Sequence, residues 1–139
     1  MEFNLVLPIE PNTKPRQTVR DKWKKRPVVI KYRLFADGLR LLCMEAGYQV
    51  TSPLSLTFVV RMPDSWSKKK KALYNGQPHE STPDLDNLIK AFKDALMEDD
   101  CSIHTYGQMK KIWGEEGCII IHLNDTQAEN IKHEKIVLA

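Results

Sequence analysis

The sequence lacks the marks of several protein classes. No apolar run approaches the roughly 20 residues that a membrane-spanning helix needs, so we expect no membrane segment. The start of the chain, Met1 to Asn4, has neither the basic residues nor the apolar core of a secretory signal. The three cysteines, Cys43, Cys101 and Cys118, form no Cys-x-x-Cys pair, which argues against a zinc ribbon, a thioredoxin-like site and a disulfide framework. A reducing, intracellular compartment is therefore expected.

The composition is that of one globular domain. The 139 residues are 42% hydrophobic and 28% charged, which separates the chain from disordered proteins. No internal repeat is present. We predict a single domain over residues 1–139, with a basic loop at 12–27 and a C-terminal extension at 124–139.

The net charge of +3 conceals a segregation of charge. Nine bases and one acid lie between Lys14 and Arg33, whereas seven acids and two lysines lie between Glu80 and Asp100. A basic surface beside an acidic cluster suits a polyanion bound across a cation site, although a solvated surface with uneven charges is the alternative. The expected polyanion-binding residues are Lys14, Arg16, Arg20, Lys22, Lys24, Lys25, Arg26, Lys68, Lys69, Lys70 and Lys71.

Alternating and helical apolar patterns predict an α/β domain of the α+β kind, a small mixed sheet packed by two main helices. The expected elements are strands at 3–9, 54–61, 108–113 and 117–123, the last two forming a hairpin, and helices at 29–46 and 83–98. In the first helix the apolar residues fall at helical spacing, namely Ile30, Leu34, Leu41 and Met44, with Phe35, Leu42 and Ala46 beside them. One turn of helix is expected near 67–73.

The chemistry is concentrated at the start of the second helix. Asp84 and Asp86 are two residues apart, and in the extended backbone before a helix such side chains point the same way. Convergent carboxylates repel one another unless a cation lies between them. Mg²⁺ accepts one or two carboxylates and fills its other positions with water and phosphate oxygens. A third acid from Asp99 or Asp100 would complete the site if the chain folds back.

Lys90 lies one helical turn beyond Asp86. It could reach a scissile phosphate and stabilise the charge that develops on it, while the metal activates water for in-line attack. The alternative is an ordinary helix face on which Asp86, Lys90 and Asp94 form i, i+4 pairs, each contributing about 0.2–0.5 kcal/mol. In that case Asp84 is a capping residue.

The stretch DLDNLIKA at 84–91, with DAL at 94–96 and the acidic doublet at 99–100, resembles the RusA family of Holliday junction resolvases. The resemblance implies a homodimeric, Mg²⁺-dependent endonuclease, with Mn²⁺ as a possible substitute. Such enzymes resolve four-way DNA junctions by paired phosphodiester hydrolysis in recombination and repair. The resemblance further implies a phage or prophage gene and the cytoplasm of a bacterial host.

The resemblance also assigns roles to individual residues. It implies Asp84, Asp86 and Asp100 as metal ligands and catalytic acids, and Lys90 as the catalytic lysine. Asp99 is the alternative to Asp100, because only two residues separate the helix from the doublet here.

Two further functions stay open: a nuclease of flaps or forks, and a non-catalytic DNA-binding module whose acids only cap and pair. Trp23 and Trp66 could stack on bases opened at a branch point. His79 could be an outer metal ligand or contact the scissile phosphate, although a lone loop histidine is more often a surface residue. Trp113 is expected in the core. Cys101 has no base placed to activate it and is expected to be inert.

Overall fold

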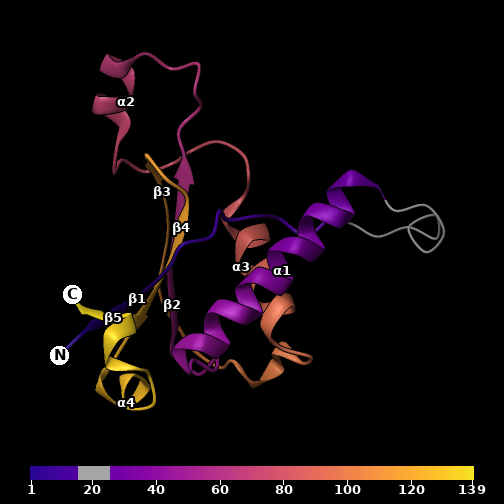
Figure 1. The fold of residues 1–139 in the computed structure, drawn as a ribbon, viewed down its shortest axis with the longest axis vertical. Helices are drawn as coiled ribbons and strands as arrows, with labels where there is room; N and C mark the ends of the chain where they lie inside the picture. Colours follow the sequence, from indigo (N-terminus) through magenta and orange to yellow (C-terminus); the bar gives the residue numbers. More distant parts are fainter. Residues whose placement is uncertain (16–25) are drawn as a thin grey trace.

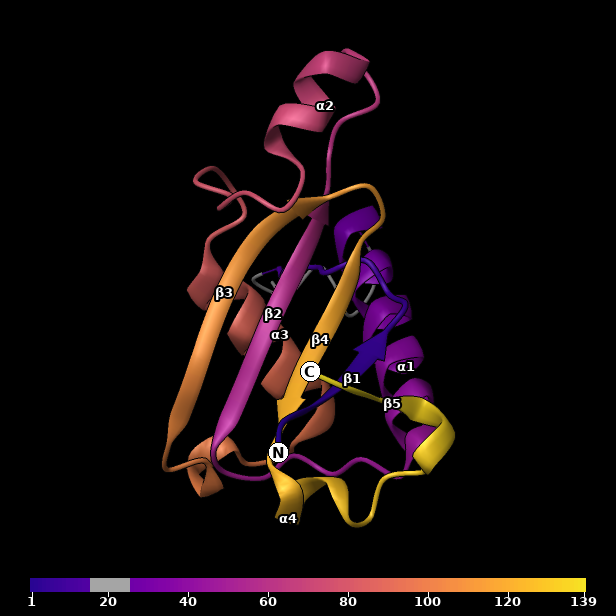
Figure 2. The same ribbon diagram turned by 90° about the vertical axis from the view of Figure 1, so that its left-hand side faces the viewer.

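The computed structural model describes residues 1–15 and 26–139 as a mixed five-stranded sheet with two long helices against one face (Figures 1 and 2). The strands are β1 (Phe3–Leu7), β2 (Leu54–Arg61), β3 (Tyr106–Gly114), β4 (Cys118–Leu123) and β5 (Ile136–Leu138). The helices are α1 (Pro27–Ala46), α2 (Lys68–Tyr74), α3 (Leu85–Leu96) and α4 (Asp125–Ala128), with 3₁₀ turns at Asp100–Ser102 and His133–Lys135. The predicted α+β class is confirmed. Within the described ranges, no helix combines the length and apolarity that crossing a membrane requires.

The strand order is β3-β2-β4-β1-β5, with β2 and β3 parallel and the other neighbours antiparallel. The predicted hairpin is therefore wrong, because β2 lies between β3 and β4. Strand β2 buries Leu56 and Phe58 on one face and Thr57 and Val59 on the other, so it gains most from a neighbour along each edge. The connection after Gly114 passes over the end of β2.

Helix α3 follows its predicted pattern. Leu88, Ile89 and Phe92 are buried against the sheet, and Leu85 and Leu96 pack against the same core. Full burial of side chains of this size contributes about 1.5–3 kcal/mol each. The helix is thus held by one strongly apolar face, and its other face is free to carry charged residues.

Helix α1 has one buried side and one exposed apolar side. Its buried residues are Val29, Tyr32, Phe35, Ala36, Leu39, Cys43 and Ala46. Ile30, Leu34, Leu41 and Met44 lie on the outside, with Leu34 68% and Met44 74% exposed. Both faces of α1 are apolar, so helical spacing alone could not select the inner one.

The C-terminal extension is ordered, and it adds the edge strand β5, which pairs with β1 in the register Phe3↔Leu138. Helix α4 begins with a capping box between Asn124 and Gln127. Most of the predicted basic loop lies outside the described residues, and this part contains Arg16, Arg20, Lys22, Trp23, Lys24 and Lys25.

Candidate active site

Asp84 and Asp86 lie where the chain enters α3. Asp84 is the N-cap residue with extended backbone (φ −67°, ψ 142°), and Asp86 is in the first turn. Both side chains are exposed. Among residues 1–15 and 26–139, neither carboxylate has a side-chain hydrogen bond or an ion pair. Two carboxylates at the positive end of a helix are thus available to a cation.

Lys111 of β3 anchors the loop that precedes Asp84. Its Nζ donates to the carbonyl oxygens of Ser81 at 2.5 Å and Pro83 at 2.6 Å. The chain before Ser81 also follows β3, because the His79 N–H donates to the Lys111 carbonyl at 2.9 Å. The position of Asp84 is therefore set from the edge of the sheet.

Sequence reasoning missed Lys111. The available signal was strand alternation: Lys111 shares a face with Met109 and Trp113, which places it on the side of β3 that packs inward. A lysine between two such residues needs acceptors close by.

His79 is buried, with 5% of its surface exposed, so the expectation of a surface histidine is wrong. Its ring stacks on that of Trp113, with 3.8 Å between centroids. Burial lowers the pKa of His79, and the charge of Lys111 lowers it further. The neutral ring can accept at Nδ1, and the Ser81 N–H lies 3.3 Å from that atom. Trp113 itself is half-buried beneath this ring.

A cleft of about 780 Å³ opens beside Asp84 and is lined by Glu80, Ser81 and Lys111 among others. A second cleft of about 740 Å³ shares Pro78, Glu80 and Ser81 with the first. The two clefts are neighbours, and together they extend from the entry of α3 to the base of α2. A polymeric substrate with more than one monomer unit could occupy both clefts.

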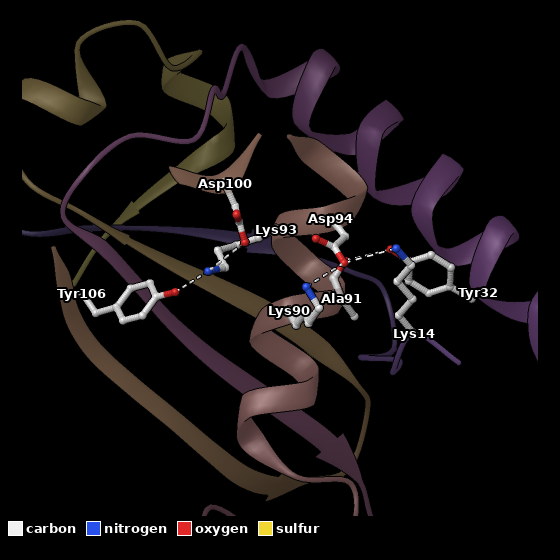
Figure 3. A network of polar contacts seen from close by, with 8 residues as sticks. All are labelled: Lys14, Tyr32, Lys90, Ala91, Lys93, Asp94, Asp100 and Tyr106. Carbon is white, nitrogen blue, oxygen red and sulfur yellow. Dashed lines mark hydrogen bonds and ion pairs between the residues drawn. The ribbon is translucent and has the colours of Figure 1, made fainter. Parts of the chain in front are cut away.

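Lys90 projects from the outer side of α3 (Figure 3). Its Nζ lies 3.4 Å from Oδ2 of Asp94, and Lys14 approaches the same oxygen at 3.2 Å. The side chain of Lys90 is 65% exposed, so this ion pair contributes at most about 1 kcal/mol. Lys90 can therefore leave Asp94 at little cost when a phosphate is bound.

Asp100 lies beyond the other end of α3. It sits 3.4 Å from Nζ of Lys93, which also donates to the Tyr106 hydroxyl at 2.5 Å (Figure 3). The hydrogen bond to Tyr106 is the main reason that the pKa of Lys93 is raised, and Asp100 adds to it. Asp99 instead accepts a hydrogen bond from the Cys101 N–H at 3.1 Å.

The structure does not bring the predicted third acid to the other two within one chain. The 12 residues of α3 separate the Asp84 end from Asp100, a length of about 18 Å. In the described part of the chain, no three His, Cys, Asp or Glu side chains meet in a group that could hold a metal. Helix α3 thus lies between Asp84 and Asp100 within one chain.

The remaining predicted basic residues lie in separate parts of the molecule. The four lysines from Lys68 to Lys71 belong to α2, which stands beyond the end of the sheet (Figures 1 and 2). Lys14 lies beside Asp94, and Arg26 directly precedes α1. The four lysines thus lie in one short helix, and Lys70 among them lines the second cleft.

Comparison with known protein families finds a match over most of the chain. The sequence profile described as endodeoxyribonuclease RusA matches residues 8–124. No match is found among curated proteins. The matched region contains both clefts, Asp84, Asp86, Lys90 and Asp100. The chain therefore belongs to the RusA family of junction-resolving endodeoxyribonucleases.

Proposed function

We propose that this protein is a Mg²⁺-dependent endonuclease that resolves four-way DNA junctions by paired cuts during recombination and repair. The observation that carries the proposal is the pair of exposed carboxylates, Asp84 and Asp86, at the entry of α3 beside an open cleft. The family resemblance supports a bacterial cytoplasm and a phage or prophage gene as its setting.

The donor set fits a hard divalent cation. Carboxylate oxygens are the ligands that Mg²⁺ prefers, and Mg²⁺ usually keeps several waters when only one or two carboxylates hold it. Asp84 and Asp86 would hold the ion, and Mn²⁺ accepts the same ligands. When bound, such an ion polarises the phosphodiester and lowers the pKa of a bound water.

The protein side chains perform the remaining tasks. Lys111 fixes the loop that carries Asp84 through its contacts with Ser81 and Pro83. Lys90 leaves Asp94 and donates to the phosphate, where its charge stabilises the negative charge that develops during hydrolysis. In the reaction, the oxygen of a water molecule bonds to phosphorus while one P–O bond of the DNA strand breaks. The DNA ends that result can be joined by a ligase.

A homodimer is part of the proposal, because two cuts on symmetry-related strands need two equivalent sites. The exposed apolar stripe of α1 supports it, since a stripe of this kind on a soluble domain marks an interaction surface. Charge supports a second copy as the occupant. In an antiparallel two-fold pairing centred near Gly38, the exposed Lys31 of one chain faces the partner's Glu45.

The dimer also offers a role for Asp100 that a single chain does not allow. We propose that Asp100, with Asp99 as the alternative, serves the Asp84 end of α3 in the second copy. The rigid α3 helix keeps the two ends apart within one chain. In a two-fold dimer that sets the two α3 helices antiparallel and side by side, each site would receive acids from both chains.

The basic residues would hold the DNA backbone. Lys68 to Lys71 on α2 and Lys14 are the described candidates, and Arg26 and the residues of the 16–25 segment belong to the same proposal. Contacts of this kind recognise phosphates and the shape of branched DNA rather than sequence. Affinity is therefore expected to fall steeply as salt is raised.

The direct test uses a synthetic four-way junction with and without Mg²⁺, beside linear duplex, flap and fork substrates. Asp84→Asn and Asp86→Asn keep the side-chain shape and remove the charge. Each variant should lose cleavage and keep junction binding, whereas Asp125→Asn, an exposed acid on α4, should cleave normally. Normal cleavage by both site variants would favour the non-catalytic DNA-binding module, and preferred cutting of flaps or forks would change the substrate.

Mixing two inactive variants tests the shared site. If the acids come from both copies, Asp84→Asn chains mixed with Asp100→Asn chains form heterodimers with one intact site and regain nicking. If each chain holds its own metal, the mixture stays inactive. Nicking rather than paired cutting is expected, because the second site of each heterodimer carries both substitutions.

A further inference from the structure

Helix α2 projects beyond the sheet without a core of its own (Figures 1 and 2). None of its seven residues is buried, and Leu73 is 70% exposed. An isolated helix of this length is unstable in water. The contacts at its base must therefore hold it.

Aromatic rings form those contacts. The ring centroid of Trp66 lies 5.3 Å from that of Tyr74 and 4.8 Å from that of Trp113. Trp113 in turn stacks on the buried ring of His79. The series Tyr74, Trp66, Trp113 and His79 runs from α2 into the body of the protein, so α2 stands on a rigid aromatic base.

The outer end of this base is open. Trp66 is half-buried, Tyr74 is 39% exposed, and both line the cleft of about 740 Å³. This volume is within the range of small-molecule sites and exceeds what one nucleoside requires. An open, partly apolar cleft with aromatic walls suits a flat ring that can stack.

A cation already lies on these rings. Nζ of Lys70 is 4.2 Å from the Trp66 centroid and 5.8 Å from the Tyr74 centroid. A lysine side chain is flexible, and its ammonium binds phosphate as a point charge. When a phosphate draws Lys70 away, the ring faces beneath it are released for stacking.

The same cleft is adjacent to the proposed catalytic one. Pro78, Glu80 and Ser81 line both. The segment that carries them is fixed to β3, since the Gly76 N–H donates to the Trp113 carbonyl at 2.8 Å and the Trp113 N–H donates to the Gln77 carbonyl at 3.0 Å. The distance between the two clefts is thus set by the sheet edge.

We propose that this cleft is a stacking subsite for one unpaired base of the DNA, next to the phosphate bound at Asp84. Trp66 and Tyr74 supply the stacking faces, and Lys70 holds the phosphate of the same nucleotide. The proposal rests on DNA being the substrate. It would make α2 a sensor of bases that open at a branch point, where a base pair lacks a continuous stacked neighbour and opens at a lower cost than inside a linear duplex.

The test measures binding without cleavage. The protein is the Asp84→Asn chain in the absence of metal, and the probes are a single-stranded oligonucleotide, a four-way junction and a linear duplex. Trp66→Leu keeps an apolar side chain and loses the aromatic face, whereas Trp66→Phe keeps an aromatic face. Circular dichroism and thermal unfolding confirm that each variant is folded.

Stacking of one base predicts that Trp66→Leu binds the single strand and the junction about 10- to 100-fold more weakly, with an unchanged dependence on salt. Trp66→Phe should restore most of the affinity. Lys69→Ala, a neighbouring lysine that does not line the cleft, should instead reduce the salt dependence. A single abasic nucleotide beside the branch point should weaken junction binding by the protein that retains Trp66. The same change should leave junction binding by the Trp66→Leu variant unchanged.

Other outcomes overturn the proposal. A folded Trp66→Leu protein that binds the single strand as tightly as its parent removes the stacking role. An equal loss of affinity for linear duplex means that Trp66 only supports α2. Because no cleavage is measured, a protein that fails to cut junctions can still pass this test, and one that cuts them can fail it.

Discussion

Replacing Lys111 with methionine tests how the position of Asp84 is set. Lys111→Met keeps the aliphatic stem and removes the ammonium that donates to the Ser81 and Pro83 carbonyls. A hydrogen bond from a charged donor contributes about 1.5–3 kcal/mol. Ser81 is exposed and water can replace one of the two bonds, so the expected loss of unfolding free energy is about 2–3 kcal/mol in total rather than the full sum.

The effect on catalysis should exceed the effect on binding. Once the loop is released, Asp84 is no longer held in one position, and a displacement of about 1 Å from the reacting geometry can cost about 100-fold in rate. The affinity for the junction should change by no more than a few fold, because the lysines proposed to bind phosphates are on α2 and at Lys14. Lys111→Arg should recover part of the rate, since its longer side chain still carries donors.

Urea unfolding and single-turnover junction cleavage measure the two effects. Lys135→Met, which changes an exposed lysine in the 3₁₀ turn at His133–Lys135, is the matched control. If Lys111→Met unfolds at the same urea concentration as this control and cleaves at the same rate, the two carbonyl contacts do not hold the loop.

Three further predictions concern separate parts of the molecule. Lys90→Ala should lose at most about 1 kcal/mol of stability yet cleave at least about 100-fold more slowly. Normal cleavage by Lys90→Ala would make this lysine structural. A normal rate for Lys90→Arg would mean that charge alone suffices. Leu34→Glu should weaken self-association by at least about 100-fold in ultracentrifugation, or about 3 kcal/mol, whereas Val137→Glu on β5 should not; equal behaviour excludes the α1 surface. Because the pKa of His79 is lowered in the folded protein, the unfolded chain binds the proton first as pH falls. The stability should therefore decrease as pH drops below about 6.5. His79→Phe should flatten this decrease, and an unchanged pH dependence would show that His79 does not cause it.

The features that local patterns determine were predictable from the sequence. Helix α3 and its buried face follow from the spacing of Leu88, Ile89 and Phe92, and the position of Asp84 at the helix entry follows from the helix start. Strands β2 and β4 also form close to where alternation places them. Each of these depends on residues only a few positions apart.

The features that depend on distant contacts were not predictable in the same way. Strands β3 and β4 are close in sequence, yet β2 separates them, because pairing with a strand that is buried on both faces outweighs a short turn. Helix α1 has apolar residues on both its inner and its outer side, and contacts with other elements, such as the hydrogen bond from the Tyr32 hydroxyl to the Ala91 carbonyl, show which side lies inside. The same limit hid His79 and Lys111, whose partners lie on another element.

The central place of β2 has a consequence during synthesis. Its two neighbours, β3 and β4, are made only after the whole connection of residues 62–105, which carries α2, Asp84, Asp86 and Lys90. At about 5–20 residues per second, β2 waits for seconds with both edges unpaired. Chains that stop before Leu123 should therefore aggregate through these edges and show no nuclease activity. A growing polypeptide would thus be unable to cut DNA until its sheet had closed around β2.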